Sequence, residues 1–181
     1  KAEEILEDIK RAVEEALRKL EESVRRNKER IREAVERLRE TVKEAKERVD
    51  EVKRELEEKG VDRSLIRRVE EVVKRVLDIN RRLIEEVEDV VKKSEEINAD
   101  LIREVRTVVT DVERIIRENG ELEEVLRKVR EDLERIIRRV EEESKKSHKD
   151  SEDVLRRVEE RSKKSLEELE DIIKKVKEEA D

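Results

Sequence analysis

The chain has 181 residues, 57% of them charged, and its 55 acids and 48 bases leave a net charge of −7. It contains no cysteine, proline, methionine or aromatic residue, which excludes disulfides, thiolate chemistry and cysteine-ligated metals. The near balance of charge and the regular spacing of the apolar residues argue against disorder. No apolar run approaches the ~20 residues that span a bilayer, and no targeting peptide is visible, so the compartment stays unknown. We expect one soluble, all-α domain over residues 1–181.

A first helix is predicted over about 2–59. Its apolar residues, from Ile5 and Ile9 to Leu56, recur about every 3.6 residues, the period of an undistorted α-helix. A strict heptad repeat would give about 3.5 and a left-handed supercoil, so long, nearly straight helices are expected. After it, Gly60 supplies a left-handed conformation, and Asp62 is placed to cap the next helix.

The middle helix, about 62–118, lies between Gly60 and Gly120, the only glycines. For much of its length its apolar stripe is two residues wide, as at Val72 and Val73. The sequence Asn119-Gly120-Glu121 then repeats the helix-ending pattern. The third helix, about 121–179, has no apolar side chain from 141 to 153 or from 159 to 165. We therefore expect the third helix to be held least firmly.

The two joints are short, and short joints force consecutive helices to run antiparallel. Three helices of similar length then give an antiparallel up-down-up three-helix bundle. One continuous helix, or an opened and domain-swapped dimer, would require Gly60 or Gly120 to stay helical at a cost of ~1 kcal/mol each. In the bundle, neighbours on the first two helices have residue numbers that sum to about 121, and those on the second and third to about 240.

This geometry brings the scarce uncharged polar residues to two shared heights. Ser94 should lie beside Asn27 and Ser147, and Asn80 beside Thr41 and Ser162. We predict two buried polar layers that set the register of the helices, because sliding would strand their donors and acceptors. The larger contains Ser23, Asn27, Ser94, Asn98, Ser144, Ser147, His148 and Ser151; the smaller contains Thr41, Asn80, Ser162 and Ser165. The alternative is that these are ordinary surface residues aligned by accident, and Thr107 and Thr110 fit neither layer.

His148 is the only histidine. The helical di-metal pattern requires a Glu three residues before a His, where this chain has Lys145. We therefore read His148 as a hydrogen-bonding member of the larger layer; if it is buried and neutral, its protonation near pH 5–6 would strain that layer. No catalytic, cofactor-binding or metal-binding residue is predicted. Both glycines end helices, so no phosphate loop is expected. An acidic chain without aromatics predicts no nucleic-acid binding, and helices so charged on their outer faces predict no membrane binding.

Together these features resemble those of computationally designed helical bundles with buried hydrogen-bond networks. The resemblance covers the whole chain and rests on equal helix lengths, matched Gly60 and Gly120 joints, a Leu/Ile/Val/Ala core and confined Ser, Asn, Thr and His. Natural spectrin-like rods carry a core tryptophan that this chain lacks. The resemblance implies a structural scaffold without biochemical activity: a monomeric three-helix rod that needs no partner. The alternative is an interaction module whose groove accepts another helix, from a second copy or another chain.

Overall fold

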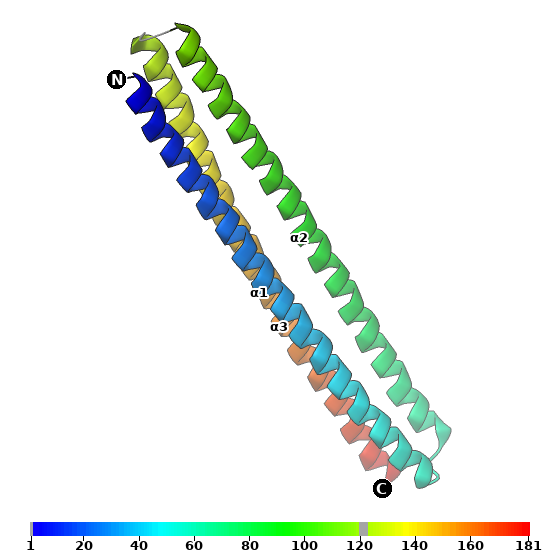
Figure 1. Ribbon diagram of the computed structural model, residues 1–181. Helices are drawn as coiled ribbons and strands as arrows, with labels where there is room; N and C mark the ends of the chain where they lie inside the picture. The colour runs from blue at the N-terminus through cyan, green and yellow to red at the C-terminus, as the bar shows by residue number, and fades with distance from the viewer. Residues whose placement is uncertain (1, 120–122) are drawn as a thin grey trace. The chain divides into compact units, whose positions relative to one another are not determined.

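The protein consists of three long α-helices. The structure, a computed structural model, describes residues 2–119 and 123–181. The helices are α1 (Ala2–Glu58), α2 (Arg63–Asn119) and α3 (Glu123–Ala180) (Figure 1). Helix α1 packs against α2 and α3, which makes the chain a three-helix bundle, as the sequence predicts, with no strand among the described residues. The predicted joint at Gly120 and Glu121 lies outside those residues.

The contacts divide the chain into two compact units, and each unit contains a stretch of all three helices. Unit 1 comprises Lys1–Lys28 and Val90–Ser151, and unit 2 comprises Glu29–Asp89 and Glu152–Asp181. The single domain over 1–181 stays a prediction. We describe each unit separately.

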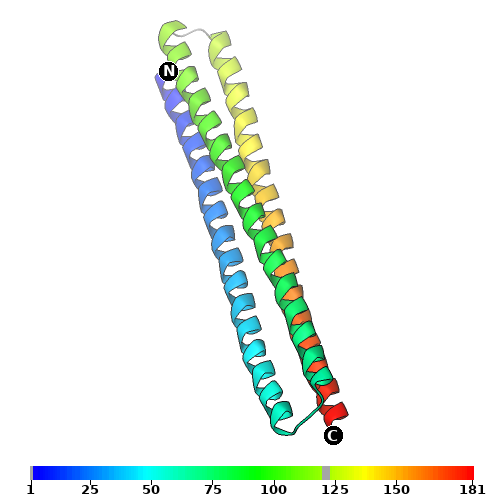
Figure 2. The same ribbon diagram turned by 90° about the vertical axis from the view of Figure 1, so that its right-hand side faces the viewer.

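Unit 1 has its own apolar core, because the buried residues of each helix recur at helical spacing and meet on one side. Ion pairs along its edges show how the helices run: Lys10 with Glu113, and Lys28 with Glu95 at 2.7 Å, place the beginning of α1 beside the end of α2 (Figure 2). These helices are therefore antiparallel. The core residues are Val13, Leu17, Leu20, Leu101, Val105, Val112, Ile116, Val129, Leu133 and Val140.

Unit 2 has a second apolar core. The α1–α3 ion pair Arg48–Glu170, at 3.4 Å, and the α1–α2 pair Lys53–Glu70, at 3.0 Å, join the helices along its edges. Arg30 and Arg48 pair with Glu152 and Glu170 in the same order, so α1 runs parallel to α3. Arg39 and Lys53 pair with Glu88 and Glu70 in the reverse order, so α1 runs antiparallel to α2. The core residues are Val49, Val52, Leu56, Val69, Val76, Leu169, Ile172, Ile173 and Val176.

The turn between α1 and α2 follows the chemistry that its sequence predicts. Gly60 has a φ of 67°, its N–H donates to the Glu57 carbonyl, and the Val61 N–H donates to the Leu56 carbonyl, each at 3.1 Å. These are the two bonds of a Schellman motif, and Val61 also packs against the cluster that contains Leu56. Asp62 Oδ1 then accepts a hydrogen bond from the Ser64 N–H at 3.3 Å and caps α2.

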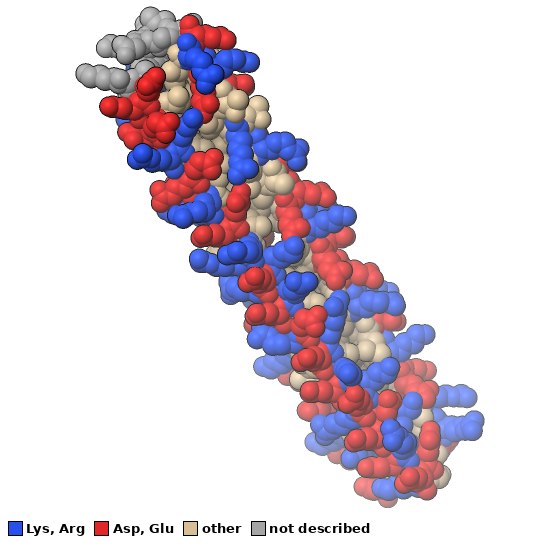
Figure 3. Space-filling view, viewed as in Figure 1, with Lys and Arg blue, Asp and Glu red and all other residues tan. Residues whose placement is uncertain are grey.

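Charged residues of both signs are interspersed over the face drawn in Figure 3. Many form ion pairs between exposed side chains, such as Arg157 with Glu86 at 2.7 Å and Arg139 with Glu104 at 3.0 Å. Exposed pairs of this kind contribute about 0–1 kcal/mol each. The apolar cores and the polar residues among them therefore decide how the helices fit together.

Candidate functional site

The larger set of polar residues lies in unit 1 and is called the unit 1 polar layer: Ser23, Asn27, Ser94, Asn98, Ser144, Ser147 and Ser151. Asn27, Asn98, Ser147 and Ser151 are buried, and the other three are half-buried. They interrupt apolar stripes at positions in phase with the neighbouring core residues. The layer is therefore part of the interior, as expected for side chains that face the other helices.

Hydrogen bonds connect three members of this layer across two helices. Ser94 Oγ on α2 and Ser147 Oγ on α3 lie 3.5 Å apart, and Asn98 Nδ2 donates to Ser94 Oγ at 3.4 Å. Ser151 Oγ instead donates to the Ser147 carbonyl in its own helix at 2.8 Å. The structure therefore brings Ser94 to Ser147, whereas the described hydrogen bonds do not include Asn27, Ser23 or Ser144.

Two buried amide atoms in the same layer have no hydrogen-bond partner: Asn27 Nδ2 and Asn98 Oδ1. Their residues are only 5% and 3% exposed, and a buried polar atom without a partner costs about 1–3 kcal/mol. Asn27 lies in α1 next to Lys28, and Lys28 pairs with Glu95, the residue after Ser94 on α2. Asn27 is therefore level with its predicted partner Ser94 but forms no hydrogen bond with it. The unit 1 polar layer is only partly satisfied.

His148 requires a correction. The sequence analysis placed it in the buried layer, but its side chain is exposed. The reason is helical phase: each residue turns ~100° from the one before, so the position after a buried Ser147 points well away from the core. The burial that the pH-sensitivity hypothesis required is therefore absent at His148.

The smaller set lies in unit 2 and is called the unit 2 polar layer: Thr41, Asn80, Arg161, Ser162 and Ser165. Asn80 and Ser165 are 3% and 1% exposed. Ser165 Oγ lies 3.0 Å from Asn80 Oδ1 and 2.8 Å from the Arg161 carbonyl, and it can donate to either. Asn80 thus meets Ser165, one helical turn beyond the predicted Ser162. Ser162 and Thr41 are half-buried and take no part in the described hydrogen bonds.

Arg161 is the member of this layer that the sequence analysis missed. Its side chain is only 16% exposed; its Nε donates to Asn80 Oδ1 at 3.3 Å, and its Nη2 pairs with Glu168 Oε2 at 3.2 Å. Two donors on one oxygen fix the orientation of the Asn80 amide, and Asn80 Nδ2 is left without a partner. The available signal was position, because Arg161 precedes Ser165 by four residues and shares its side of the helix.

Thr107 and Thr110, which fit neither predicted layer, lie exposed on α2. Each Oγ1 donates at 3.0 Å to the carbonyl four residues earlier, at Arg103 and Arg106 respectively. This bond satisfies a threonine hydroxyl within its own helix. These two residues therefore act locally and need no partner on another helix.

Two hydrogen-bonded ion pairs at the bundle edges shift pKa values. The hydrogen bond from Lys10 to Glu113 raises the pKa of Lys10, and the attraction of that carboxylate adds to the effect. The hydrogen bond from Arg68 lowers the pKa of Glu179. Both shifts favour the charged forms, so these groups act as paired ions and offer no general acid or base near neutral pH.

Comparison with known proteins matches the chain to no protein family and to no curated sequence. Within residues 2–119 and 123–181, no His, Cys, Asp and Glu side chains gather in a group of three that could hold a metal ion. In the same ranges, none of the helices combines the length and the apolar character needed to cross a membrane. The chemistry of the two layers is that of donors and acceptors held between helices.

Proposed function

We propose that the chain is a computationally designed structural scaffold: a monomeric three-helix bundle without biochemical activity, whose polar layers set the register of its helices. The observation that carries this proposal is Asn80 Oδ1 on α2, which accepts hydrogen bonds from Ser165 and Arg161 on α3. Moving α3 by one turn would bring Leu169 to the place of Ser165 and leave the buried amide without its hydroxyl donor. Such a layer contributes specificity more than stability.

The idealised construction of the chain supports the proposal further. Its turn at Gly60 uses a complete Schellman motif followed by the Asp62 cap, and its cores consist of Val, Leu and Ile. These features are typical of backbones and sequences chosen to agree at every level.

Disulfide cross-linking tests the register directly, because the chain has no cysteine of its own. A Ser94→Cys/Ser147→Cys pair replaces two oxygens 3.5 Å apart and should oxidise quickly. A Ser94→Cys/Ser151→Cys pair tests a shift of one turn and should oxidise at least ~10-fold more slowly. Removing the unit 2 layer with Asn80→Leu/Ser165→Ala should let the register shift and so narrow the difference in oxidation rate between the two cysteine pairs. An unchanged difference would refute the role of this layer in register.

A second candidate function is a helix-binding or self-associating module. It is favoured by Ile97, which is 53% exposed on α2, and by Val90, which is exposed on the same side of that helix. Near Ser147, α3 has no apolar side chain to cover them. Light scattering after size-exclusion chromatography separates self-association from the other possibilities: a multiple of 21.8 kDa supports self-association. A mass near 21.8 kDa supports either the monomeric scaffold or a module that binds a helix of another chain, and peptide binding then separates these two.

A further inference from the structure

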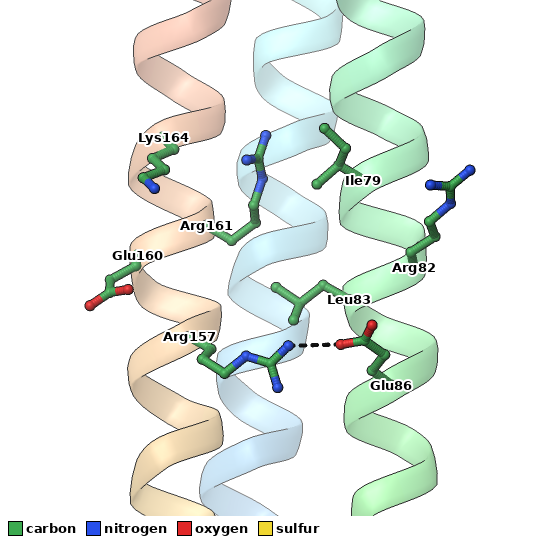
Figure 4. Close-up of a pocket in the computed structure, with 8 residues that line it drawn as sticks. All are labelled: Ile79, Arg82, Leu83, Glu86, Arg157, Glu160, Arg161 and Lys164. Carbon is green, nitrogen blue, oxygen red and sulfur yellow. Dashed lines mark hydrogen bonds and ion pairs between the residues drawn. The ribbon is translucent and has the colours of Figure 1, made fainter.

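Unit 2 has a groove between α2 and α3 with a volume of about 380 Å³. In Figure 4, Ile79 and Leu83 from α2 and Arg161 from α3 point into the space between these helices. Arg82 lies on the far flank of α2, and Glu160 and Lys164 lie on the far flank of α3. The groove thus has a small apolar floor and the Arg161 cation, is crossed by the Arg157–Glu86 ion pair, and lies between two charged flanks.

The charges that line this groove are unequal. Four are basic (Arg82, Arg157, Arg161 and Lys164) and two are acidic (Glu86 and Glu160). Glu86 is already paired with Arg157 at 2.7 Å, the dashed line in Figure 4. Arg161 is likewise paired with Glu168 at 3.2 Å. The remaining lining charges, Arg82 and Lys164 against Glu160, leave a small positive surplus in a chain whose net charge is −7. A ligand for this groove therefore needs negative charge at its edges.

Arg161 gives the groove a specific anchoring point. Its Nε and Nη2 bind Asn80 and Glu168, which holds the guanidinium in place. Its Nη1 takes part in none of the hydrogen bonds given for the described residues. A partly buried guanidinium in a fixed orientation binds a carboxylate more strongly than an exposed, mobile one, because less side-chain entropy is lost and less water screens the pair.

We propose that this groove docks an acidic amphipathic helix from another chain. Apolar side chains of that helix pack over the half-buried Ile79, next to the already buried Leu83. One of its carboxylates binds Arg161, and acids on its flanks face Arg82 and Lys164. A helix is the occupant because a groove between two helices accepts the apolar face of a further one. The inference rests on the second candidate function and names its partner class.

The test uses the whole chain and a synthetic helix of about 28 residues, four heptads with Leu and Ile at the core positions. One peptide carries Glu at the flanking positions and the other carries Lys. Each has a single Trp on its outer face, so the emission comes from the peptide alone, since the protein has no aromatic residue. Fluorescence anisotropy should show the acidic peptide binding at least ~10-fold more tightly than the basic one, with a difference that shrinks in ~0.5 M salt.

Matched variants locate the site. Arg161→Gln should weaken binding of the acidic peptide by about 5- to 10-fold. Arg156→Gln removes the same charge from the same helix, but Arg156 is exposed and does not line the groove, so its effect should stay below about 2-fold. Arg82→Gln/Lys164→Gln, two exposed positions whose change leaves the interior intact, should weaken binding about 3-fold. Circular dichroism of each variant checks that the fold is retained.

Several results would overturn the inference: no binding of the acidic peptide at ~100 μM, at which a contact of even modest affinity is visible; equal or tighter binding of the basic peptide; or equal losses for Arg161→Gln and Arg156→Gln. A dimeric mass for the free chain without acidic-peptide binding would also reject this groove, while leaving self-association as a function. A monomer that binds neither peptide would reject the groove and leave the scaffold function standing.

Discussion

The two polar layers provide hydrogen-bond partners for their buried amides in different ways. In the unit 1 polar layer, neutral groups meet at 3.4–3.5 Å, and two buried amide atoms have no partner. In the unit 2 polar layer, an ion takes part: Arg161 and Ser165 lie 3.3 and 3.0 Å from one amide oxygen, and Arg161 is itself paired with Glu168. Between helices, the unit 1 layer has one long contact, whereas the unit 2 layer has two closer ones, of which one comes from a charged donor. The unit 2 layer also leaves one amide atom, Asn80 Nδ2, without a partner.

The difference shows what orients a buried amide. Turning the Asn98 amide over would let its oxygen accept from the Ser94 hydroxyl, so both orientations leave one atom without a partner and neither is strongly preferred. Turning Asn80 over would direct an N–H at the Arg161 N–H, which is unfavourable. The Arg161 cation thus fixes the orientation of the buried amide in its layer, whereas hydroxyls alone allow both orientations of theirs.

The largest expected effect comes from removing the better satisfied layer. Asn80→Leu/Ser165→Ala takes both the acceptor and the hydroxyl from Arg161, leaving a partly buried cation with fewer partners, and should lower the free energy of unfolding by about 1–3 kcal/mol. Urea denaturation followed by circular dichroism measures it. Ser162→Ala, at a half-buried neighbour outside the described network, is the control and should change little. Equal stability of the double variant and the parent would show that the Arg161 network adds nothing to the free energy of unfolding.

Hydrogen exchange should distinguish two stretches of α3. Residues 141–153 bring no apolar side chain to the bundle, whereas Val154, Leu155 and Val158 are buried. Amides near Ser147 should therefore open more easily and exchange at least ~10-fold faster than those near Val158. Slower exchange near Ser147 would contradict the weaker hold inferred for this middle stretch of α3.

Removing the unit 1 layer should have the opposite sign to removing the unit 2 layer. Asn27→Leu/Ser94→Ala/Ser147→Ala replaces partly unsatisfied polar groups with apolar ones, so the thermal midpoint should hold or rise, by the equivalent of about 0–2 kcal/mol. The uniqueness of packing should fall, seen as broader NMR signals. A sharp loss of stability with unchanged, well-dispersed spectra would refute this.

The smallest effects concern pH and differ between the units. The lowered pKa of Glu179 in unit 2 means that its contribution is present above its unfolded pKa, near 4.5, and is lost as pH falls through the lower folded value. The raised pKa of Lys10 in unit 1 means the reverse: its contribution is present below 10.5 and is lost as pH rises through the higher folded value. Arg68→Gln should flatten only the acid limb of the stability profile, and Glu113→Gln only the alkaline limb. Urea midpoints measured across both limits test this, and a variant that flattened the opposite limb would contradict it.

Periodicity and turn chemistry were enough to predict the helices and the Gly60 turn, because 3.6-residue spacing and a left-handed glycine are local properties of the chain. Antiparallel counting also placed Ser94 and Ser147 at one height, where they meet. The height of a residue along an antiparallel pair follows from its residue number alone, so this placement could be predicted.

Direction around a helix is harder to predict. Counting gave Asn80 the partner Ser162, but Ser165 points more squarely at the core and is almost fully buried. His148 was misplaced for the same reason, since it follows a buried serine by one residue. Arg161 was overlooked because a long charged side chain reads as surface, although its stem can fold along an interface and carry the charge inward.

The turn at Gly60 also bears on the order of folding. Within unit 2, α1 and α2 form a continuous hairpin around that turn, Glu29–Asp89, whereas the α3 segment Glu152–Asp181 comes from a distant part of the chain. Contacts near in sequence close smaller loops and form sooner. The hairpin should therefore assemble first by zipping away from Gly60, with α3 arriving last, so Gly60→Ala should slow refolding more than Leu169→Ala does for the same loss of stability.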